Sequence, residues 1–498
     1  MKGISIKILL FLSGIALISN SCRESELDLQ PGFINEESFF SREIDYDRGV
    51  RGIYSKMTDW YWFNNNSPIH GLWHLPGDDI TTVGNNAFEI FGPVQPANGA
   101  VNGYYTTAYI IVNRANTMLE KLQEATPDIY TTPGLKDRHR GETLFLRGLT
   151  YFNLWNHFGS SPLITERIRE TAQTRQRNAQ GNSLLDQAIK DLEEAAGLLP
   201  ARWDTLNRGR VTANAANGLL GKALVFRATV ANAQADHQAA LAAFNKITDA
   251  SLVPNFADNF AANRENNAES LFEFQASQSL GDNVWLPNDF GNATGSMSTY
   301  WGFYENHWSM FGTPPYIATR KLVTAFEPGD PRRNITLDSA TRAIRKYVQG
   351  DRKAGNGVGS LNNPRILRYA DVLLLKAEAL VRSGGSLTEA IGLVNQVRGR
   401  ARSMRPGGTV PADRPATETN REQVMRWIMD ERFIELAGEE TRWFDLKRWS
   451  RANLVTLNNA FFDSANALMS FNNQRDLLLP IPTGEIDLNP DITQNPGY

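Results

Sequence analysis

The amino-acid sequence predicts a mainly α-helical protein whose helices pair in the manner of tetratricopeptide repeats. Three observations favour this fold class. Apolar residues recur with helical spacing in the middle and late segments, two helix–turn–helix segments resemble each other, and the stretches between them have no clear period. With 498 residues and 41% hydrophobic side chains, the chain has the composition of a folded globular protein.

The N-terminus has the pattern of an export signal. Lys2 and Lys7 supply positive charge, and residues 8–18 form an apolar run that is short for a membrane-spanning helix. No later segment approaches the roughly 18 uninterrupted apolar residues of such a helix. We therefore expect a signal peptide over residues 1–21 and no further membrane span.

The only cysteine, Cys22, follows this signal within ISNSC and precedes a polar segment. A lone cysteine cannot form an internal disulfide bond. It is either an incidental thiol near a cleavage site or a lipoprotein cysteine that is acylated after cleavage, and its position favours the second interpretation. Ser19 stands where such signals usually have leucine. We expect Cys22 to be the lipidation site that tethers the remaining chain to a membrane.

Helical periodicity continues through most of the segments that follow. The helix at 142–159 has a clear stop signal, because Gly159 ends it and Pro162 lies just beyond. Apolar spacing predicts helices at 104–125, 142–159, 184–200, 212–230, 235–250, 369–385 and 386–401, and a last helical pair from Arg421 to about Trp449.

Two of these helix pairs resemble each other. The pattern AEALVRSGG…EAIGLVNQV in residues 369–401 is similar to GKALVFRAT…AALAAFNKI in residues 212–250. Pairs of this size are typical of tetratricopeptide repeats, whose period is roughly 34 residues. Because the two pairs are far apart in the sequence, any continuous stack of repeats must be interrupted.

Long stretches without a period separate the helical segments, at 55–103, 275–318 and 350–364. Loops of this length in a folded protein are usually functional. They divide the domain at 22–498 into an N-terminal helical half (about 22–250), a loop-rich middle (about 251–365) and a C-terminal helical half (about 366–498). The tail from Leu477 is apolar at its start and rich in proline, so we expect it to pack across the helices in extended form.

Aromatic and asparagine residues gather in the first two of these loops. A sugar ring stacks its C–H groups on an aromatic face, while its hydroxyl groups need amide, carboxylate or guanidinium partners. The alternative is that the aromatic side chains anchor the loops to the scaffold. We expect both roles to occur, and the candidate ligand-binding residues are Trp60, Trp62, Asn65, Trp73, Trp285, Tyr300, Trp301, Tyr304, Asn306 and Trp308.

Other functional classes have little support in the sequence. The 51 basic and 54 acidic residues give a net charge of -3, which offers no basic surface for nucleic acid. There is no Gly-x-Ser-x-Gly motif, and the single cysteine is assigned to the signal junction, so no nucleophile is apparent. No motif indicates a cofactor.

Two acidic groups could suggest catalysis or metal binding. The segment ERFIELAGEETRWFDLKRW (431–449) is rich in carboxylates, but Glu431 and Glu435 lie four residues apart on a helix near Arg432 and Arg442, which is typical of ordinary ion pairs. The second group comprises His70, His74, Asp78 and Asp79. Gly71 and Pro76 argue against a single helix that presents both of these histidines, so we expect no metal there.

Several segments resemble one family, the SusD/RagB-like outer-membrane lipoproteins. The resemblance covers nearly the whole chain and starts at Cys22. It depends on five segments that occur in the order expected for the family. These are RGLTYFNLWNHFGSSPL (147–163), IATRKLVTAFEPGDPRR (317–333), YADVLLLKAEAL (369–380), ERFIELAGEETRWFDLKRW (431–449) and LLPIPTGEIDLNPDITQNPGY (478–498).

The resemblance implies a scaffold of about four tetratricopeptide-like pairs with long ligand-binding loops and minor strands. It further implies a surface-exposed, lipid-anchored protein of the outer membrane. Such a protein captures oligosaccharides, or peptides in some members, for a SusC-like TonB-dependent barrel, and it is not an enzyme. The alternatives are a surface glycoside hydrolase and an assembly scaffold without a small ligand. A negatively charged sugar or a peptide remains open as cargo, because Arg320, Lys321 and the segment 350–353 could contact it.

Overall fold

The computed structural model describes residues 39–61, 71–82, 84–92, 94–276, 316–348, 362–463 and 466–498, together with the backbone of two short strands at 63–64 and 67–68. The expected signal peptide and Cys22 lie outside these residues.

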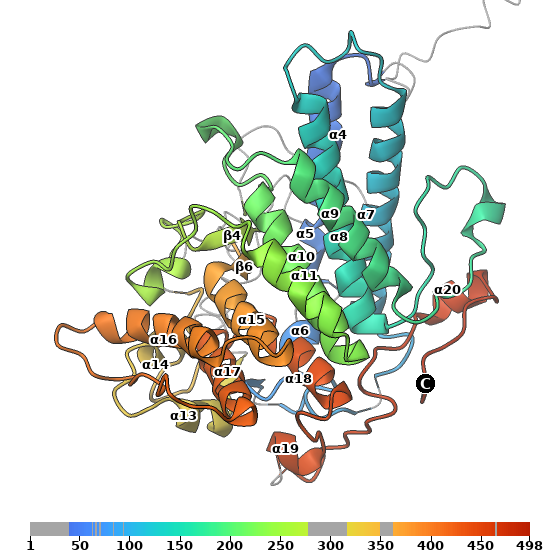
Figure 1. Cartoon of the computed structure of the whole chain (residues 1–498). Coiled ribbons are helices and arrows are strands. Elements are labelled where there is room, and N and C mark those ends of the chain that lie inside the picture. The colour runs from blue at the N-terminus through green and yellow to red at the C-terminus, as the bar shows by residue number, and fades with distance from the viewer. Residues whose placement is uncertain are drawn as a thin grey trace, which may run out of the picture.

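The described chain is mainly helical, as predicted (Figure 1). The N-terminal elements are α4 (Glu43–Lys56), α5 (Thr58–Tyr61), β1 (Phe63–Asn64), β2 (Ser67–Pro68), α6 (Gly71–His74), β3 (Ile80–Thr81), α7 (Gly99–Glu124), α8 (Leu135–Phe158), η1 (Thr171–Thr174), α9 (Ser183–Leu198), η2 (Thr205–Asn207), α10 (Ala213–Ala231) and α11 (Gln234–Phe244). The elements that follow are η3 (Phe256–Asn259), β4 (Ser270–Glu273), β5 (Ile317–Ala318), α13 (Arg320–Ala325), α14 (Arg333–Thr336), β6 (Arg365–Arg368), α15 (Tyr369–Arg382), α16 (Leu387–Ser403), α17 (Arg421–Glu435), α18 (Arg442–Arg451), α19 (Asn459–Asp463) and α20 (Thr483–Leu488).

Consecutive helices pack as pairs. α7 packs on α8, α8 on α9, α10 on α11, and α15 on α16. The two pairs that resemble each other in sequence meet in space, because α15 packs against both α10 and α11. The two helices of the last predicted pair separate, since α17 packs on α15 and α16 whereas α18 packs on α10 and α6. The interrupted stack expected from the sequence is therefore continuous in the folded protein (Figure 1).

Polar side chains cap the N-termini of several helices. Asn98 accepts hydrogen bonds from two backbone N–H groups at the start of α7, and Asn420 does so at α17. Thr212 and Ser386 each cap one such group, at α10 and α16. Each cap satisfies backbone donors that have no partner within the helix.

The end of α8 is fixed by Gly159, as the sequence predicted. Its φ of 69° is a left-handed conformation that favours glycine. A Cβ atom at this position would lie 2.8 Å from the side chain of Leu478, so glycine also allows the tail to approach. The tail then crosses the helical body, where the backbone N–H of Leu479 donates to the carbonyl of His157 and the Asn495 amide donates to that of Phe158. The expected packing of the tail is confirmed, with α20 as one helical turn within it.

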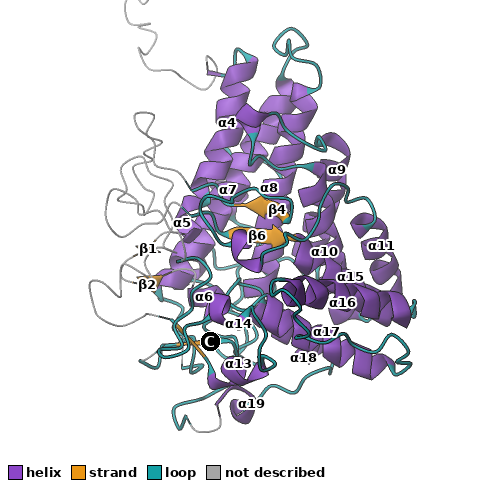
Figure 2. Cartoon of the chain, turned by 90° about the vertical axis from the view of Figure 1, so that its left-hand side faces the viewer, coloured by secondary structure: helices purple, strands orange, loops and turns teal. Residues whose placement is uncertain are grey.

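The described strands form three two-stranded antiparallel sheets, β1–β2, β3–β5 and β4–β6. β4 pairs with β6, which lies almost a hundred residues later, and the backbone N–H of Phe274 extends this pairing to the carbonyl of Pro364. Figure 2 shows β4 and β6 side by side, and both strands pack against α10. The β3–β5 and β4–β6 sheets thus join segments on either side of the long loops.

Most buried apolar side chains form one core cluster that runs from α4 to the tail, and a smaller cluster lies among α15, α16 and α17. Among the described residues, no helix is long and apolar enough to cross a membrane.

The sequence prediction missed α4 and the first two turns of α8. α4 buries Tyr46, Val50 and Ile53, a helical spacing that its charged residues and two glycines obscure. The start of α8, residues 135–141, is mostly polar, yet His139 is fully buried there because α4 and the 126–132 turn cover it. Tertiary packing, and not local apolar periodicity, determines both helices.

Candidate functional site

The described ends of the three long loops meet in one place. Tyr61 stacks on Phe274, with ring centres 5.0 Å apart, at the ends that flank residues 62–70 and 277–315. The backbone N–H of Ala276 donates to the side chain of Asn363 at 2.8 Å, just after the segment 349–361. These contacts connect the first, second and third loops at one side of the scaffold.

Further contacts close this arrangement into a ring. The Asn362 amide donates to the carbonyl of Tyr347, and the backbone N–H of Ile344 donates to the carbonyl of Tyr316. At Gly71, a Cβ atom would lie 3.3 Å from the hydroxyl oxygen of Tyr316. We call this ring the aromatic base; its aromatic members are Tyr61, Trp73, Phe274, Tyr316 and Tyr347.

Two predicted ligand-binding residues lie within or below the aromatic base and must be reassigned. Trp60 is 1% exposed and stacks on Tyr104 with ring centres 5.2 Å apart, and its indole N–H donates to the Tyr104 carbonyl. Trp73 is 3% exposed and contacts Tyr61 and the edge of Tyr104. A ring covered on this scale by scaffold residues offers no face to a sugar. For these two residues the ligand-binding prediction was wrong, and the anchoring alternative holds.

The other candidate ligand-binding residues are outside the described part of the chain. They are Trp62, Asn65, Trp285, Tyr300, Trp301, Tyr304, Asn306 and Trp308.

The floor of the aromatic base is largely uncharged. Burial raises the pKa of the phenol groups of Tyr61 and Tyr104 well above 10, and the nearby Glu440 carboxyl raises both further. Burial also raises the pKa of Glu440 well above its usual range. A site built above this floor meets neutral groups from below.

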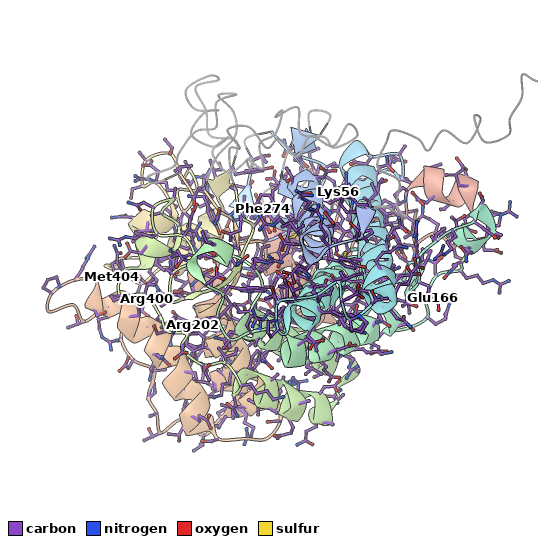
Figure 3. The ribbon with its side chains drawn as sticks, turned by 90° about the horizontal axis from the view of Figure 1, so that it is seen from above. Lys56, Glu166, Arg202, Phe274, Arg400 and Met404 are labelled. Carbon is purple, nitrogen blue, oxygen red and sulfur yellow. The ribbon has the colours of Figure 1, made fainter. Side chains whose placement is uncertain are left out.

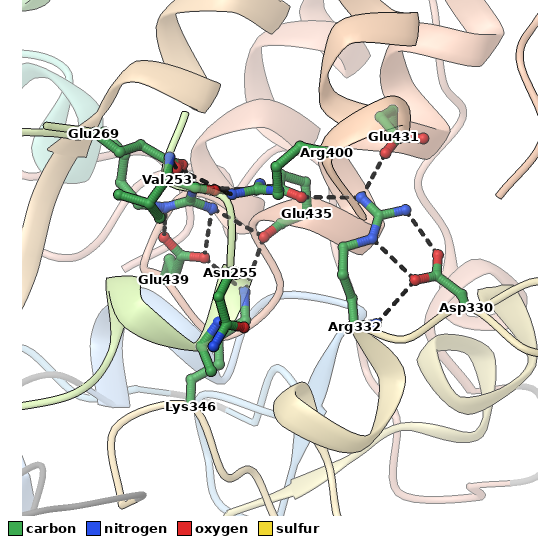
Figure 4. A network of polar contacts seen from close by, with 12 residues as sticks. Val253, Asn255, Glu269, Asp330, Arg332, Lys346, Arg400, Glu431, Glu435 and Glu439 are labelled. Carbon is green, nitrogen blue, oxygen red and sulfur yellow. Dashed lines mark hydrogen bonds and ion pairs between the residues drawn. The ribbon is translucent and has the colours of Figure 1, made fainter. Parts of the chain in front are cut away.

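The carboxylates of the 431–449 segment are buried in ion pairs, not exposed on the surface. Glu435 contacts the guanidinium groups of Arg332, Arg368 and Arg400, and Glu431 contacts those of Arg332 and Arg398 (Figure 4). We call this cluster the ion-pair network; it also includes Glu269, Asp330, Lys346 and Glu439.

The expectation of ion pairs is confirmed, but the expected partners were wrong. Arg432 pairs with Asp371 and Asp445, and Arg442 pairs with Asp78. Burial alone would raise the pKa of Glu435, yet Arg400, Arg368 and Arg332 lower it below its usual range. Since Glu431 and Glu435 are at most 1% exposed, neither can reach a glycosidic bond.

The acidic pair at Asp78 and Asp79 also has structural partners. Asp78 pairs with Arg442 and Lys321, and Asp79 accepts a hydrogen bond from the backbone N–H of Gly438. Burial, together with the negative charge of Asp78, raises the pKa of Asp79 to about 6 although the Gly438 N–H opposes the shift. Within the described residues, no cluster of three or more histidine, cysteine or carboxylate side chains could hold a metal ion.

Arg320 and Lys321, which the sequence offered as contacts for an acidic ligand, have different environments. Lys321 pairs with Asp78 and lies 3.7 Å from the ring centre of Phe461, so it is part of the packing. Arg320 is exposed and lines a cavity of about 240 Å³ together with Arg342 and Glu89. Lys321 is exposed as well and lines the same cavity, although its ammonium group is paired with Asp78.

Comparison with known proteins identifies the same family in both halves of the chain. The SusD family model matches residues 297–498, and a second model, described as starch-binding and associating with the outer membrane, matches residues 79–224. The chain belongs to the SusD family.

Individual SusD-like proteins match over most of their length. A SusD-like protein of Formosa agariphila is 26% identical over 95% of this chain and 96% of its own. One of Bacteroides ovatus is 24% identical over 89% of this chain and 82% of its own.

Solved structures of SusD proteins have the same fold. A SusD homologue from Bacteroides thetaiotaomicron superposes with a TM-score of 0.74 at 20% identity, covering 93% of this chain and 99% of its own. A laminarin-binding SusD-like protein superposes with a TM-score of 0.72 at 24% identity, covering 92% of this chain and all of its own. The mainly helical fold expected from the sequence is thereby confirmed.

Sequence reasoning missed the residues that hold the loop ends together. Tyr316, Phe274 and Asn363 are separated by many residues, and neither apolar periodicity nor a motif connects them. The only local signal is that each borders a stretch without a period.

Proposed function

We propose that the chain is a non-catalytic lipoprotein of the outer membrane that binds oligosaccharides at the cell surface and delivers them to a SusC-like TonB-dependent barrel. The observation that carries the proposal is the aromatic base. It gathers the ends of three long segments, two of them rich in tryptophan and asparagine, at one side of a rigid scaffold in a SusD-family chain.

The physical argument is that binding to such loops requires fixed ends. Ordering a flexible loop costs conformational entropy, and a loop whose ends are already positioned loses less on binding. The base is held by rings and backbone hydrogen bonds, with a floor of neutral groups, which suits a neutral polyhydroxylated ligand. The printed description of one matching family model, starch-binding, and the laminarin-binding relative support the same ligand class.

A lipid anchor at Cys22 fits the proposed location. The signal-like residues 1–21 precede this cysteine, and the family model for residues 79–224 is described as associating with the outer membrane. Acylation of one residue would keep the whole domain at the membrane surface.

Peptide capture in the manner of RagB is the second candidate. It is favoured by Arg320 and Arg342, whose cavity could contact a carboxylate group. A surface glycoside hydrolase is disfavoured, because the carboxylates of the 431–449 segment are buried and paired.

Affinity electrophoresis tests the proposal. The chain from residue 23 onward is run through native gels that contain neutral or acidic polysaccharides, with Trp62→Ala and Trp301→Ala beside the parent. We expect one neutral polysaccharide to retard the parent and at least one variant to lose that retardation while it melts normally.

Two other outcomes would contradict this. Binding of a peptide mixture in calorimetry, without retardation by any polysaccharide, would support peptide capture. Release of reducing ends from a retained polysaccharide would show an enzyme.

A further inference from the structure

Trp203 is the one tryptophan that belongs to neither loop cluster nor a helix. Five of the seven described tryptophans are at most 3% exposed, whereas Trp203 and Trp427 are half-buried. Trp203 lies just before η2, on the connection between α9 and α10. It lines a groove of about 440 Å³.

Three separate segments build this groove, which we call the Trp203 groove. They are residues 201–214, 249–250 and 266–273. None of the aromatic members of the aromatic base lines it. In Figure 3, Arg202 of the groove and Phe274 of the base lie apart in the view from above.

The wall that carries Trp203 is rigidly held. The indole N–H donates to the carbonyl of Val211 at 2.7 Å, and the guanidinium carbons of Arg210 and Arg138 lie 4.7 and 5.7 Å from the ring centre. Asp204 accepts hydrogen bonds from the backbone N–H groups of Leu206 and Asn207, which fixes the η2 turn. The indole therefore keeps its position without a ligand.

The opposite wall is joined to this one. Arg208 donates to the carbonyls of Glu265 and Asn266 at 2.9 and 3.0 Å, and Asn214 pairs through its side chain with the backbone of Thr248. A groove whose two walls are already connected loses little conformational entropy when a ligand enters.

The charges at the groove are balanced. Arg210 is neutralised by Glu142 and Asp47, both within hydrogen-bonding distance. Arg202 and Asp249 lie at the rim 3.5 Å apart, with side chains 73% and 61% exposed. The groove thus offers a fixed indole, amide groups and one exposed pair of opposite charges. Positive and negative charges balance in it.

We propose that the Trp203 groove binds a short neutral saccharide, as a second ligand site separate from the loops above the aromatic base. The part of the half-buried indole that Arg210 and Arg138 leave uncovered supplies apolar surface for the C–H groups of a sugar. Arg202 and Asp249 supply hydrogen-bond partners for its hydroxyl groups. The ligand class rests on the proposed function, whereas the location rests on the groove alone.

Fluorine NMR separates the two sites. The chain from residue 23 onward is labelled with 5-fluorotryptophan, and the resonances of Trp203, Trp62 and Trp301 are assigned with single Phe variants. Neutral tetrasaccharides with α-1,4 or β-1,3 linkages, and one uronic-acid oligosaccharide, are then titrated in. We expect the Trp203 resonance to shift saturably with a neutral tetrasaccharide.

Variants test whether the shift reports contact. Arg202→Ala, which changes only an exposed side chain, should weaken the saccharide affinity measured at Trp203 about tenfold. Trp203→Ala should leave the titration of the loop resonances unchanged. Trp427→Ala removes the other half-buried tryptophan, which lies under Arg414, and should change neither titration.

Each outcome has a distinct meaning. If the loop resonances shift and Trp203 does not, the groove proposal is overturned and the proposed function stands. A shift of Trp203 alone supports the groove and contradicts the loop site. If no resonance shifts with any of these saccharides, both proposals fail.

Discussion

The ion-pair network around α17 and the aromatic base at α5 and α6 are both buried, but different forces hold them. In the network, Glu435 contacts three guanidinium groups from α14, α15 and α16 or their flanking residues. In the base, the ring of Tyr61 contacts those of Trp73 and Phe274. The difference indicates two tasks, since paired charges specify how helices are oriented while rings fill space under a neutral surface.

The two regions should therefore differ in how they fail. A charge left without its partner in a buried site cannot be compensated by small movements, because it has lost its hydration. A cavity left by a removed ring can partly collapse, so the loss of folding stability depends on how well the neighbouring side chains relax.

The largest effect should come from Glu435→Ala. It removes the carboxylate shared by Arg332, Arg368 and Arg400, and we expect the free energy of unfolding to fall by up to about 5 kcal/mol. Urea unfolding measures this. Glu389→Ala, which breaks a long and half-exposed pair with Lys376, is the matched control and should cost less than about 1 kcal/mol. Equal losses in the two variants would contradict a special role for the network.

The next largest effect should come from Trp73→Ala in the aromatic base. Removing a 3% exposed indole should lower the free energy of unfolding by about 3–4 kcal/mol. Trp73→Phe retains a ring against Tyr61 and Tyr104 and should lose less than half of that. If Trp73→Ala instead unfolds like the parent but fails to bind a polysaccharide, the indole is part of the ligand site after all.

The smallest effect on stability is a pH dependence that arises from the buried carboxyl group of Asp79. The folded-state pKa of Asp79 is about 6, above an unfolded value near 4. The folded state therefore keeps a proton that the unfolded state has lost, and this group makes stability fall as the pH rises from about 4 to 6. Asp79→Asn should remove this dependence of stability on pH. Its free energy of unfolding at neutral pH should exceed that of the parent by up to about 3 kcal/mol.

Unfolding by urea at about pH 4.5 and pH 7.5 tests this prediction. Glu435 of the network should have the opposite effect, because its guanidinium partners lower its pKa and keep it charged in the folded state, and this stabilisation disappears in acid. Asp413→Asn, at an exposed carboxylate, should follow the parent at both pH values. If Asp79→Asn also follows the parent, Asp79 is not protonated in the folded state.

Much of the scaffold was predictable from the sequence because local signals determine it. Apolar spacing placed α7 to α11 and α15 to α18, and Gly159 marked the end of α8. The start of α8 was missed because His139 is buried by distant segments.

The site was less predictable because its contacts join residues far apart in the chain. The partners of Glu435 come from up to 103 residues away, whereas sequence reasoning can pair charges only with near neighbours. Likewise, nothing in the stretch around Trp60 and Trp73 indicates that Tyr104 covers both indoles.

The contact between the tail and α8 has a consequence for how the protein is made. The carbonyl of Phe158 receives the amide of Asn495, which is translated 337 residues later. Until then, the C-terminal end of α8 has carbonyl groups that this tail does not yet satisfy, and the core there remains open. A chain that stops before Asn495 would lack this closure, and the C-terminal end of α8 would be more open to proteases.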